Sequence, residues 1–592
     1  MANRNEISNE FKWDFTPMFE SDAAWEKAYA EVESAIPSVA ALAGTLCESA
    51  ESLKSALDKF YALGEKLERV YLYAMLHKNT DNGNTTYQSI EARAMSLYVN
   101  FSMATSFITP ELLAAPTETL DAFIADEKLV GYRHMLEDTA RSRAHTLDAK
   151  TERMLAMLGE AMQTPSNAFE MLEAVDMSFP ETTGEDGKPA PLTHGSYRVF
   201  LESEKRDVRR EAYEKYFGEF GRYINTITAL YSGSVKNDTF STRVRNFSSS
   251  CEAALFGSNV PVSVYDALTE AIRGGLPTMK KYIEVRKKLL GLDEVHMYDM
   301  YCPMVKSIDM SMTYDKAKEL VLRACAPLGK EYVSLLRRAF KENWVDVYEN
   351  PGKTTGAFSC GVYGVHPYVL LNFSGTLDDA FTLAHELGHS MHSYFSSREN
   401  SYANHDYKIM CAEVASTVNE VLLLKYLLSV ETDKNRRAAL LNHLLESFRT
   451  TVFRQTLFAE FERGAHEMDE RGEPLTSESL NALYRKLNLT YYDGAVVDDI
   501  HDIEWARIPH FYNAFYVYQY ATGFCSAVKI ASDILKTGDA SAYLKFLSTG
   551  GSDYPLEELK IAGIDLTKPD TVRSALEVFA ETLDEFKELM GA

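Results

Sequence analysis

The stretch HELGHSMH occupies residues 385–392 and carries three histidines, a glutamate and a glycine in eight positions. The residues just before it, Thr376 to Asp379, predict a capping box that opens a helix. Apolar residues then recur at helical spacing. His385 and His389 are therefore expected to lie four positions apart on one face of a helix. Two imidazoles at this spacing can bind one metal ion.

Glu386 lies between the two histidines and can reach a water on such an ion, which is the H-E-x-x-H arrangement of zinc peptidases. The alternative is a helix with two hydrogen-bonded core histidines. Gly388 favours a close packing partner, because glycine inside a helix costs about 1 kcal/mol relative to alanine. His392 lies on the same face, but seven residues of helix rise about 10 Å. That distance is too long for metal bonds of about 2 Å, so we expect His392 to pack or to position a ligand.

The third metal ligand is expected from the apolar helix KIMCAEVASTVNEVLLLKYLL, residues 408–428. Glu413 lies in its least polar part, where a carboxylate is costly unless it is paired or binds a metal. We predict Glu413 as the third ligand, in preference to a core salt bridge. Glu420 lies two turns later on the same face and is predicted to orient a ligand histidine. A fourth, open position would hold water, as catalytic zinc requires.

The composition predicts a large, mainly helical globular protein. The chain has 592 residues, of which 46% are hydrophobic and 25% charged, with a net charge of −25. No basic stripe is visible, so no nucleic-acid partner is expected. No uninterrupted apolar run reaches about 18 residues, so no membrane span is predicted. Seven scattered cysteines without a C-x-x-C pair indicate a reducing compartment, and we expect a cytoplasmic location.

The chain is predicted to form two regions. Residues 1–195 form an N-terminal helical region that ends in a short hairpin or loop at 178–197, which is rich in glycine and proline. Residues 196–592 contain the metal motif. Within them, residues 356–375 start as a glycine-punctuated loop and continue as an apolar strand, 368–373, just before the motif.

Several separated segments resemble one known family. HELGHSMH followed by AEVAST (412–417) is similar to the thimet oligopeptidase family of zinc metallopeptidases, and most of all to its oligoendopeptidase F branch. Four further segments resemble that branch in the expected order: WDFTPMFESD, LTHGSYRVFLES, GVHPYVLLNF and RIPHFYNAFYVYQYATG. The resemblance extends over most of the chain and shows no departure at the metal positions.

The resemblance implies a fold and a set of further site residues. The fold would be mainly α, with two helical halves flanking a deep substrate cleft, and residues 196–592 would be a gluzincin-type catalytic domain with a small β element beside the motif helix. His510 and Tyr516 would bind the substrate carbonyl and the tetrahedral intermediate. A second tyrosine would assist, and Tyr518 and Tyr520 compete for this role. A tyrosine-rich helix is expected here, with Tyr516 and Tyr520 four positions apart.

The resemblance also implies how substrate is held. The strand 368–373 would be an edge strand that pairs with an extended peptide, with Tyr368 among the substrate-binding residues. The loop 356–364, with Gly361 and Gly364, would close over the peptide.

The predicted function is therefore a zinc metalloendopeptidase that cleaves short unstructured oligopeptides. One Zn²⁺ per chain would be bound, with Glu386 as the general base. The chain is expected to be a monomer or a weak homo-oligomer. Two alternatives remain: a helical zinc carboxypeptidase, and a non-catalytic peptide-binding protein with a degenerate metal site.

Overall fold

Helices dominate the computed structural model, which describes residues 2–305 and 310–592. The prediction of a mainly α fold is confirmed. The described strands are short and form two two-stranded sheets and one three-stranded sheet. None of the helices in the described residues combines the length and the apolar character needed to cross a lipid bilayer.

The described residues divide into two compact units, each built from three chain segments. Unit 1 comprises residues 2–146, 310–426 and 530–564, and unit 2 comprises residues 147–305, 427–529 and 565–592. The divisions fall within α17 and α21, so each of these helices is assigned partly to each unit.

Unit 1 contains the following elements, apart from its share of α21: α1 (Asp22–Ala40), α2 (Ala50–Thr80), α3 (Thr85–Thr105), α4 (Ile108–Ala114), α5 (Thr117–Ala125), α6 (Arg133–Ser142), α14 (Tyr314–Ala324), α15 (Lys330–Lys341), β4 (Val345–Asp346), β5 (Phe358–Cys360), β6 (Tyr368–Leu370), α16 (Leu377–Glu399), α17 (Ile409–Val430), α22 (Ser541–Leu547) and α23 (Pro555–Ile561).

Unit 2 contains α7 (Ala149–Met162), α8 (Thr164–Met171), β1 (Thr182–Thr183), β2 (Pro189–Ala190), α9 (His194–Leu201), α10 (Arg206–Arg222), α11 (Ile224–Val244), α12 (Ser250–Phe256), α13 (Val262–Leu289), β3 (Val295–His296), α18 (Lys434–Ser447), the π-helix η9 (Phe448–Phe453), α19 (Arg454–Glu470), α20 (Ser477–Tyr491), β7 (Ala495–Val496), α21 (Tyr518–Thr537) and α24 (Asp570–Met590).

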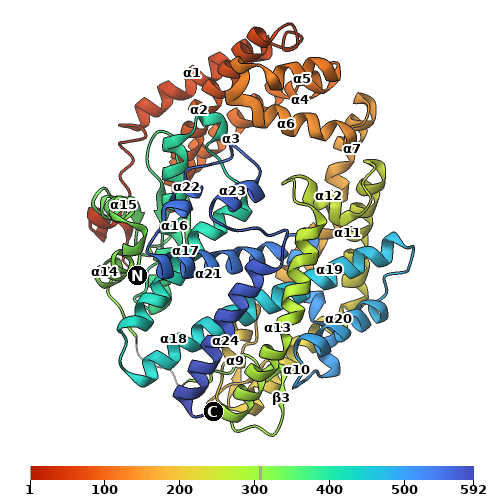
Figure 1. The fold of residues 1–592 in the computed structure, drawn as a ribbon, viewed down its shortest axis with the longest axis vertical. Coiled ribbons are helices and arrows are strands. Elements are labelled where there is room, and N and C mark those ends of the chain that lie inside the picture. The colour runs from red at the N-terminus through yellow and green to blue at the C-terminus, as the bar shows by residue number, and fades with distance from the viewer. Residues whose placement is uncertain (1, 306–309) are drawn as a thin grey trace. The chain divides into compact units, whose positions relative to one another are not determined.

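In unit 1, the helices α1, α2 and α3 pack side by side (Figure 1). Their apolar faces share one core with residues of β6. The extended segment before α1 connects these helices to the sheet. The Trp13 indole Nε1 donates to the carbonyls of Trp344 and Val369 at 3.0 and 2.9 Å. Buried hydrogen bonds of this kind satisfy the backbone of the sheet.

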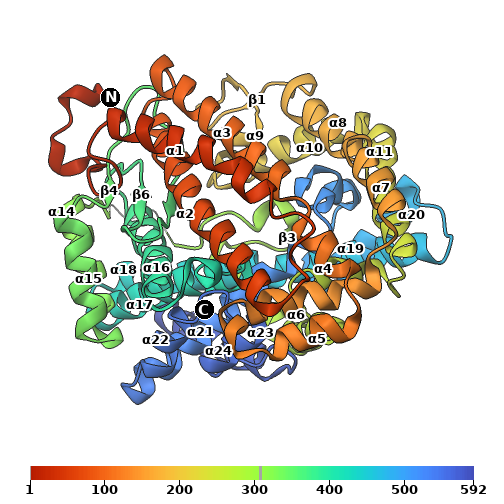
Figure 2. The ribbon, with the colours of Figure 1, turned by 90° about the horizontal axis from the view of Figure 1, so that it is seen from above.

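The three-stranded sheet has the order β4-β6-β5 and lies beside α16 (Figure 2). The Ser359 hydroxyl of β5 contacts the Ser390 hydroxyl of α16 at 2.8 Å, so the predicted β element beside the motif helix is confirmed. The prediction of an edge strand at 368–373 is wrong. β6 pairs with β4 on one side and with β5 on the other, so its backbone groups are already used.

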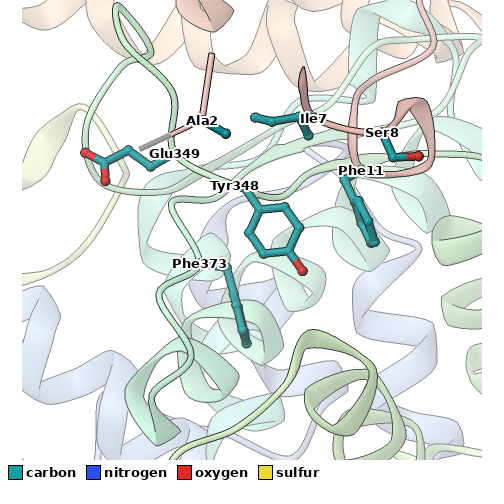
Figure 3. Close-up of a pocket in the computed structure, with 7 residues that line it drawn as sticks. All are labelled: Ala2, Ile7, Ser8, Phe11, Tyr348, Glu349 and Phe373. Carbon is teal, nitrogen blue, oxygen red and sulfur yellow. The ribbon is translucent and has the colours of Figure 1, made fainter. Parts of the chain in front are cut away.

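A surface pocket of unit 1 lies where the N-terminal segment meets the end of the sheet. In Figure 3 the ring of Tyr348 is seen between Phe11 and Phe373. Its ring centroid lies 5.0 Å from that of Phe11 and 6.4 Å from that of Phe373. The lining is mostly apolar and includes none of the predicted site residues.

The predicted hairpin is present, since β1 and β2 pair antiparallel inside the segment 178–197. The predicted regions 1–195 and 196–592 differ from the compact units, which are not continuous in sequence. The physical reason is long-range packing, because the first 146 residues share their core with strand β6. The boundary near residue 195 stays a prediction.

Candidate metal centre

The helix α16 begins at a fixed point because its N-terminus is tightly capped. The Thr376 side chain accepts from the backbone N–H of Asp379, and the Asp379 carboxylate accepts from the backbone N–H groups of Ser374, Gly375 and Thr376 at 2.8–3.1 Å. The predicted capping box is confirmed. It fixes where the histidines fall along the helix.

Helices α16 and α17 cross in very close contact at Gly388. A Cβ atom on Gly388 would lie 2.6 Å from the Ser416 Cα and 2.7 Å from the Ala415 carbonyl oxygen. Nearby, the Asn419 side chain donates to the Ala384 carbonyl at 3.0 Å. The close packing partner predicted from Gly388 is therefore confirmed, and it is the helix that carries Glu413.

This crossing brings together a group of three metal-ligating side chains. One atom each from His385, His389 and Glu413 lies within 4.8 Å of the others. The two Nε2 atoms are 3.1 Å apart, and the His385 Nε2 is 3.8 Å from a Glu413 oxygen. In the described part of the chain, this is the one group of three or more His, Cys, Asp or Glu side chains that can hold a metal. Two nitrogens and a carboxylate oxygen suit Zn²⁺, so the residues fit such an ion.

Glu420 contacts the far side of the His385 ring. The His385 Nδ1 and a Glu420 oxygen form a short hydrogen bond, which leaves Nε2 facing His389 and Glu413. Burial lowers the pKa of His385, but the hydrogen bond and the charge of Glu420 outweigh this effect and raise the pKa to about 9. The site therefore attracts positive charge. Burial, with the charge of His385, lowers the pKa of His389 to about 3, so this imidazole is neutral.

Glu386 is 7% exposed and lies beside the ligand group. Burial raises its pKa to about 7, and the charges of Glu413 and Glu420 add to the effect while His385 opposes it. Burial likewise raises the pKa of Glu413. Glu413 and Glu420 are part-buried, and carboxylates gathered in one place repel one another unless a cation lies between them.

His392 does not join the ligand group. Its buried ring stacks on Tyr407 with centroids 3.6 Å apart. The Tyr407 hydroxyl also contacts Ser393 at 2.7 Å. Tyr407 was not predicted from the sequence, because it lies in the connection between α16 and α17 and carries no periodic signal. It packs against the back of the motif helix.

The loop after β5 contains the predicted substrate-binding glycines. A Cβ on Gly361 would lie 2.9 Å from the Ser393 side chain, and Gly364 has a φ of +72° beside Arg69. Both positions therefore require glycine for packing or backbone reasons. Tyr368 is fully buried and its hydroxyl donates to the Asp14 carbonyl at 3.1 Å. Tyr368 is therefore a core residue, and its predicted contact with substrate is wrong.

A second cluster of predicted residues lies in unit 2. The Tyr520 hydroxyl is 3.3 Å from the His510 Nε2, and the Tyr516 ring centroid lies 6.3 Å from that of His510 and 5.4 Å from that of Tyr520. Burial lowers the pKa of His510. Tyr518 instead is 2% exposed and packs against Tyr265. Of the two competing tyrosines, Tyr520 is the one that contacts His510.

The continuous helix expected around these tyrosines is absent. Residues Pro509–Tyr512 form a 3-10 turn, and α21 begins only at Tyr518. Phe515 adopts a φ of +57°, which a helix cannot accommodate. The three polar rings meet because of this irregular turn and not because of helical spacing.

Two imidazoles and a carboxylate from crossing helices, with a further glutamate beside them, define the class of metallopeptidases. Comparison with known proteins supports this class. The profile of peptidase family M3 matches residues 199–578, and that of oligopeptidase F matches residues 111–179.

Relatives match along the whole chain. Oligopeptidase PepF of Bacillus subtilis is 44% identical over 594 residues, which cover 100% of this chain and 89% of the relative. An oligoendopeptidase F homolog of Lactococcus lactis is 40% identical, covering 99% of this chain and 98% of the relative. The crystal structure of oligoendopeptidase-F from Enterococcus faecium, 36% identical, has a TM-score of 0.73 over 96% of this chain and 99% of that chain. The chain belongs to peptidase family M3, in its oligoendopeptidase F branch, and is a peptidase.

Proposed function

We propose that the chain is a zinc-dependent endopeptidase that hydrolyses internal peptide bonds of short, unstructured oligopeptides. One observation carries the proposal: His385, His389 and Glu413 converge within 4.8 Å while Glu386 lies beside them. The names of the relatives, oligopeptidase and oligoendopeptidase, support short peptides as substrates.

One zinc ion per chain would be held by His385, His389 and Glu413. When bound, the ion would supply a Lewis acid that activates water and polarises the scissile carbonyl. Glu420 would hold the His385 ring with Nε2 directed at the ion, because its carboxylate engages Nδ1.

Glu386 would act as the general base. Its carboxylate would take the proton of the attacking water and deliver it to the leaving amine.

His510, Tyr516 and Tyr520 would donate hydrogen bonds to the substrate carbonyl and to the oxyanion that develops from it. Their mutual contacts support a joint role. Loss of one such donor typically costs about 3 kcal/mol in the transition state. In this proposal Gly361 and Gly364 allow the loop after β5 to contact the peptide. We further propose a cytoplasmic enzyme that is a monomer or a weak homo-oligomer.

A mixed oligopeptide pool and a peptide blocked at both ends test the proposal. We expect mass spectrometry to find internal cleavage of both, abolished by a chelator and restored by zinc. Glu386→Gln should keep zinc and lose nearly all hydrolysis. Trimming of single C-terminal residues, with the blocked peptide intact, would favour the carboxypeptidase. Peptide binding without any cleavage would favour the non-catalytic binding protein.

A further inference from the structure

Unit 2 contains a cavity of about 230 Å³ that none of the predicted site residues lines. Its walls come from α9, α10, the junction of η9 with α19, and the 3-10 helix η10 (Asp499–Arg507). His194 and Arg198 line it as well and are exposed, so the cavity has a rim that solvent reaches.

The charged cluster at the cavity carries more positive than negative charge, and three of its guanidinium groups, those of Arg449, Arg454 and Arg507, line the wall. Arg449 and Arg286 share the carboxylate of Glu446, with the Arg449 Nη2 at 2.7 Å. Arg454 and Arg507 share the carboxylate of Glu504, at 2.7 and 3.8 Å. Four guanidinium groups thus face two carboxylates. Among the described residues no further carboxylate pairs with them, so two positive charges remain unneutralised.

Such an excess is costly inside a protein. Arg449 is 1% and Arg454 8% exposed, and each shares its carboxylate with a second arginine. Buried positive charge in excess of the carboxylates destabilises the fold. The excess positive charge also affects Tyr301, which lines the cavity. Burial raises the pKa of Tyr301, but the charges of Arg454 and Arg449 outweigh burial, and the net pKa lies below the ordinary value. The cavity is therefore built for negative charge.

Backbone geometry brings two of these arginines to the same cavity. Arg449 and Arg454 are five positions apart, and the residues between them form the π-helix η9. In an α-helix, residues three or four apart share a face. In a π-helix the repeat is i to i+5. π-helical turns are rare and are frequent at functional sites, and here the turn places both guanidinium groups at the cavity.

Several buried polar atoms in the wall lack a partner. The hydroxyls of Tyr213 and Tyr492 and the Nδ1 of His501 accept or donate no hydrogen bond within the described residues. The three side chains are 2–3% exposed. Buried polar atoms are normally satisfied. Hydroxyl, imidazole and guanidinium donors around one cavity suit an oxyanion.

We propose that this cavity binds a dianionic phosphoryl group, as inorganic phosphate or as the phosphate ester of a small molecule. A dianion matches the two unneutralised charges, and several oxygens match the separate donors. A monocarboxylate matches neither. The site is independent of the metal centre, because it shares no residue with it.

Binding of inorganic phosphate to the purified full-length chain tests the proposal. We expect isothermal titration calorimetry to show saturable binding of one phosphate per chain, and phosphate to raise the unfolding temperature above that in chloride at equal ionic strength. Tyr213→Phe and Tyr492→Phe should each weaken binding about tenfold, because hydrogen bonds to a charged ligand are strong. Both changes remove only an unpartnered hydroxyl, so the fold should persist.

Tyr231→Phe is the matched control. Its hydroxyl is also buried and without a partner in the described residues, but it does not line the cavity, so phosphate binding should stay unchanged. The proposal would be overturned if no saturable phosphate binding were found, if Tyr231→Phe weakened phosphate binding as much as the other two changes, or if acetate bound as tightly as phosphate.

A parallel titration with ribose 5-phosphate distinguishes the two sources of the phosphoryl group. Tighter binding than inorganic phosphate assigns the site to an ester, and weaker binding assigns it to free phosphate. These readouts do not depend on hydrolysis, so failure here and failure of the peptidase proposal are distinguishable.

Discussion

His385 is held from two sides, and its orientation depends on Glu420. The carboxylate of Glu420 engages Nδ1 and leaves Nε2 for the ligand group. We expect Glu420→Ala to lower zinc affinity about 10–100-fold, because partners of metal-ligating histidines typically have effects of this size. Competition with a chromogenic chelator measures the affinity. Glu399→Ala removes an exposed glutamate at the end of α16 and should leave affinity unchanged. Equal zinc affinities in the wild type, Glu420→Ala and Glu399→Ala would show that Glu420 does not support the metal site.

Tyr520 and Tyr518 are two positions apart but have different surroundings. The Tyr520 hydroxyl contacts His510, whereas Tyr518 lies in the core. We expect Tyr520→Phe to lower kcat about 10²-fold, as for loss of an oxyanion donor. Tyr518→Phe should keep kcat near the wild-type value. Steady-state kinetics on a blocked peptide measures kcat for both variants. A large loss of kcat in Tyr518→Phe with none in Tyr520→Phe would assign the oxyanion contact to Tyr518.

At this scale the sequence predicts much of the candidate site. His385, Glu386 and His389 follow from one spacing, and Glu413 from the cost of a carboxylate in an apolar helix. Tyr407 has no such signal, because a connecting loop positions it. The prediction for Tyr368 was wrong because an apolar sequence is typical of edge strands and of central strands alike. Only the pairing of β6 with β4 and β5 shows that this strand is central.

The crossing of α16 and α17 depends on the missing side chain of Gly388. A Cβ there meets backbone atoms at 2.6–2.7 Å, which cannot rotate away. We expect Gly388→Ala to destabilise the protein by about 1–3 kcal/mol through overpacking, and to weaken zinc binding because the helices must separate. Urea unfolding and metal titration measure the two effects.

Gly159 provides the matched control, since it also lies inside a helix but has open space around its Cβ position. Gly159→Ala should stabilise by roughly 0.5–1 kcal/mol. If Gly388→Ala also stabilised the protein and kept zinc, the close crossing would not constrain the metal centre.

Elements with strong periodicity or caps were predictable, and irregular ones were not. The capping box at Thr376 fixes the start of α16. By contrast, the segment around Phe515 has enough apolar and aromatic residues to read as a helix, yet a positive φ interrupts it. A left-handed residue that is not glycine leaves no mark in a single sequence.

Across the whole molecule, buried titratable groups link stability to pH, and Glu462 in unit 2 is the clearest case. Burial raises its pKa to about 8, against the lowering effect of His466. A raised carboxyl pKa means that the folded state holds the proton more tightly than the unfolded state. Its stabilising contribution is therefore fully present below pH 4.5 and is lost as the pH rises through 8.

We expect Glu462→Gln to be more stable than the wild type at pH 9 and to differ little from it at pH 5, because glutamine mimics the protonated carboxyl. Urea unfolding across this range measures the free energies. Glu467→Gln, an exposed change on the same helix, should follow the wild-type curve. If the free energy of unfolding of Glu462→Gln changed with pH as it does in the wild type, Glu462 would not be the group that links stability to pH.

The composition and helical spacing predict the fold class, but not how three chain segments join in each unit. Trp13 donates to carbonyls more than 300 positions away. Such contacts follow from packing in three dimensions, and no local sequence pattern predicts them. The acidic charge of −25 restricts the class of partner but carries no information about chain topology.

Zinc content, measured together with hydrolysis in the wild type, Glu386→Gln and Glu413→Ala, tests the central claim most directly. Elemental analysis of each purified, folded protein gives the number of ions per chain. We expect one zinc per chain in the wild type and in an inactive Glu386→Gln, and little zinc in Glu413→Ala. Full zinc occupancy in Glu413→Ala, or full activity in Glu386→Gln, would contradict it.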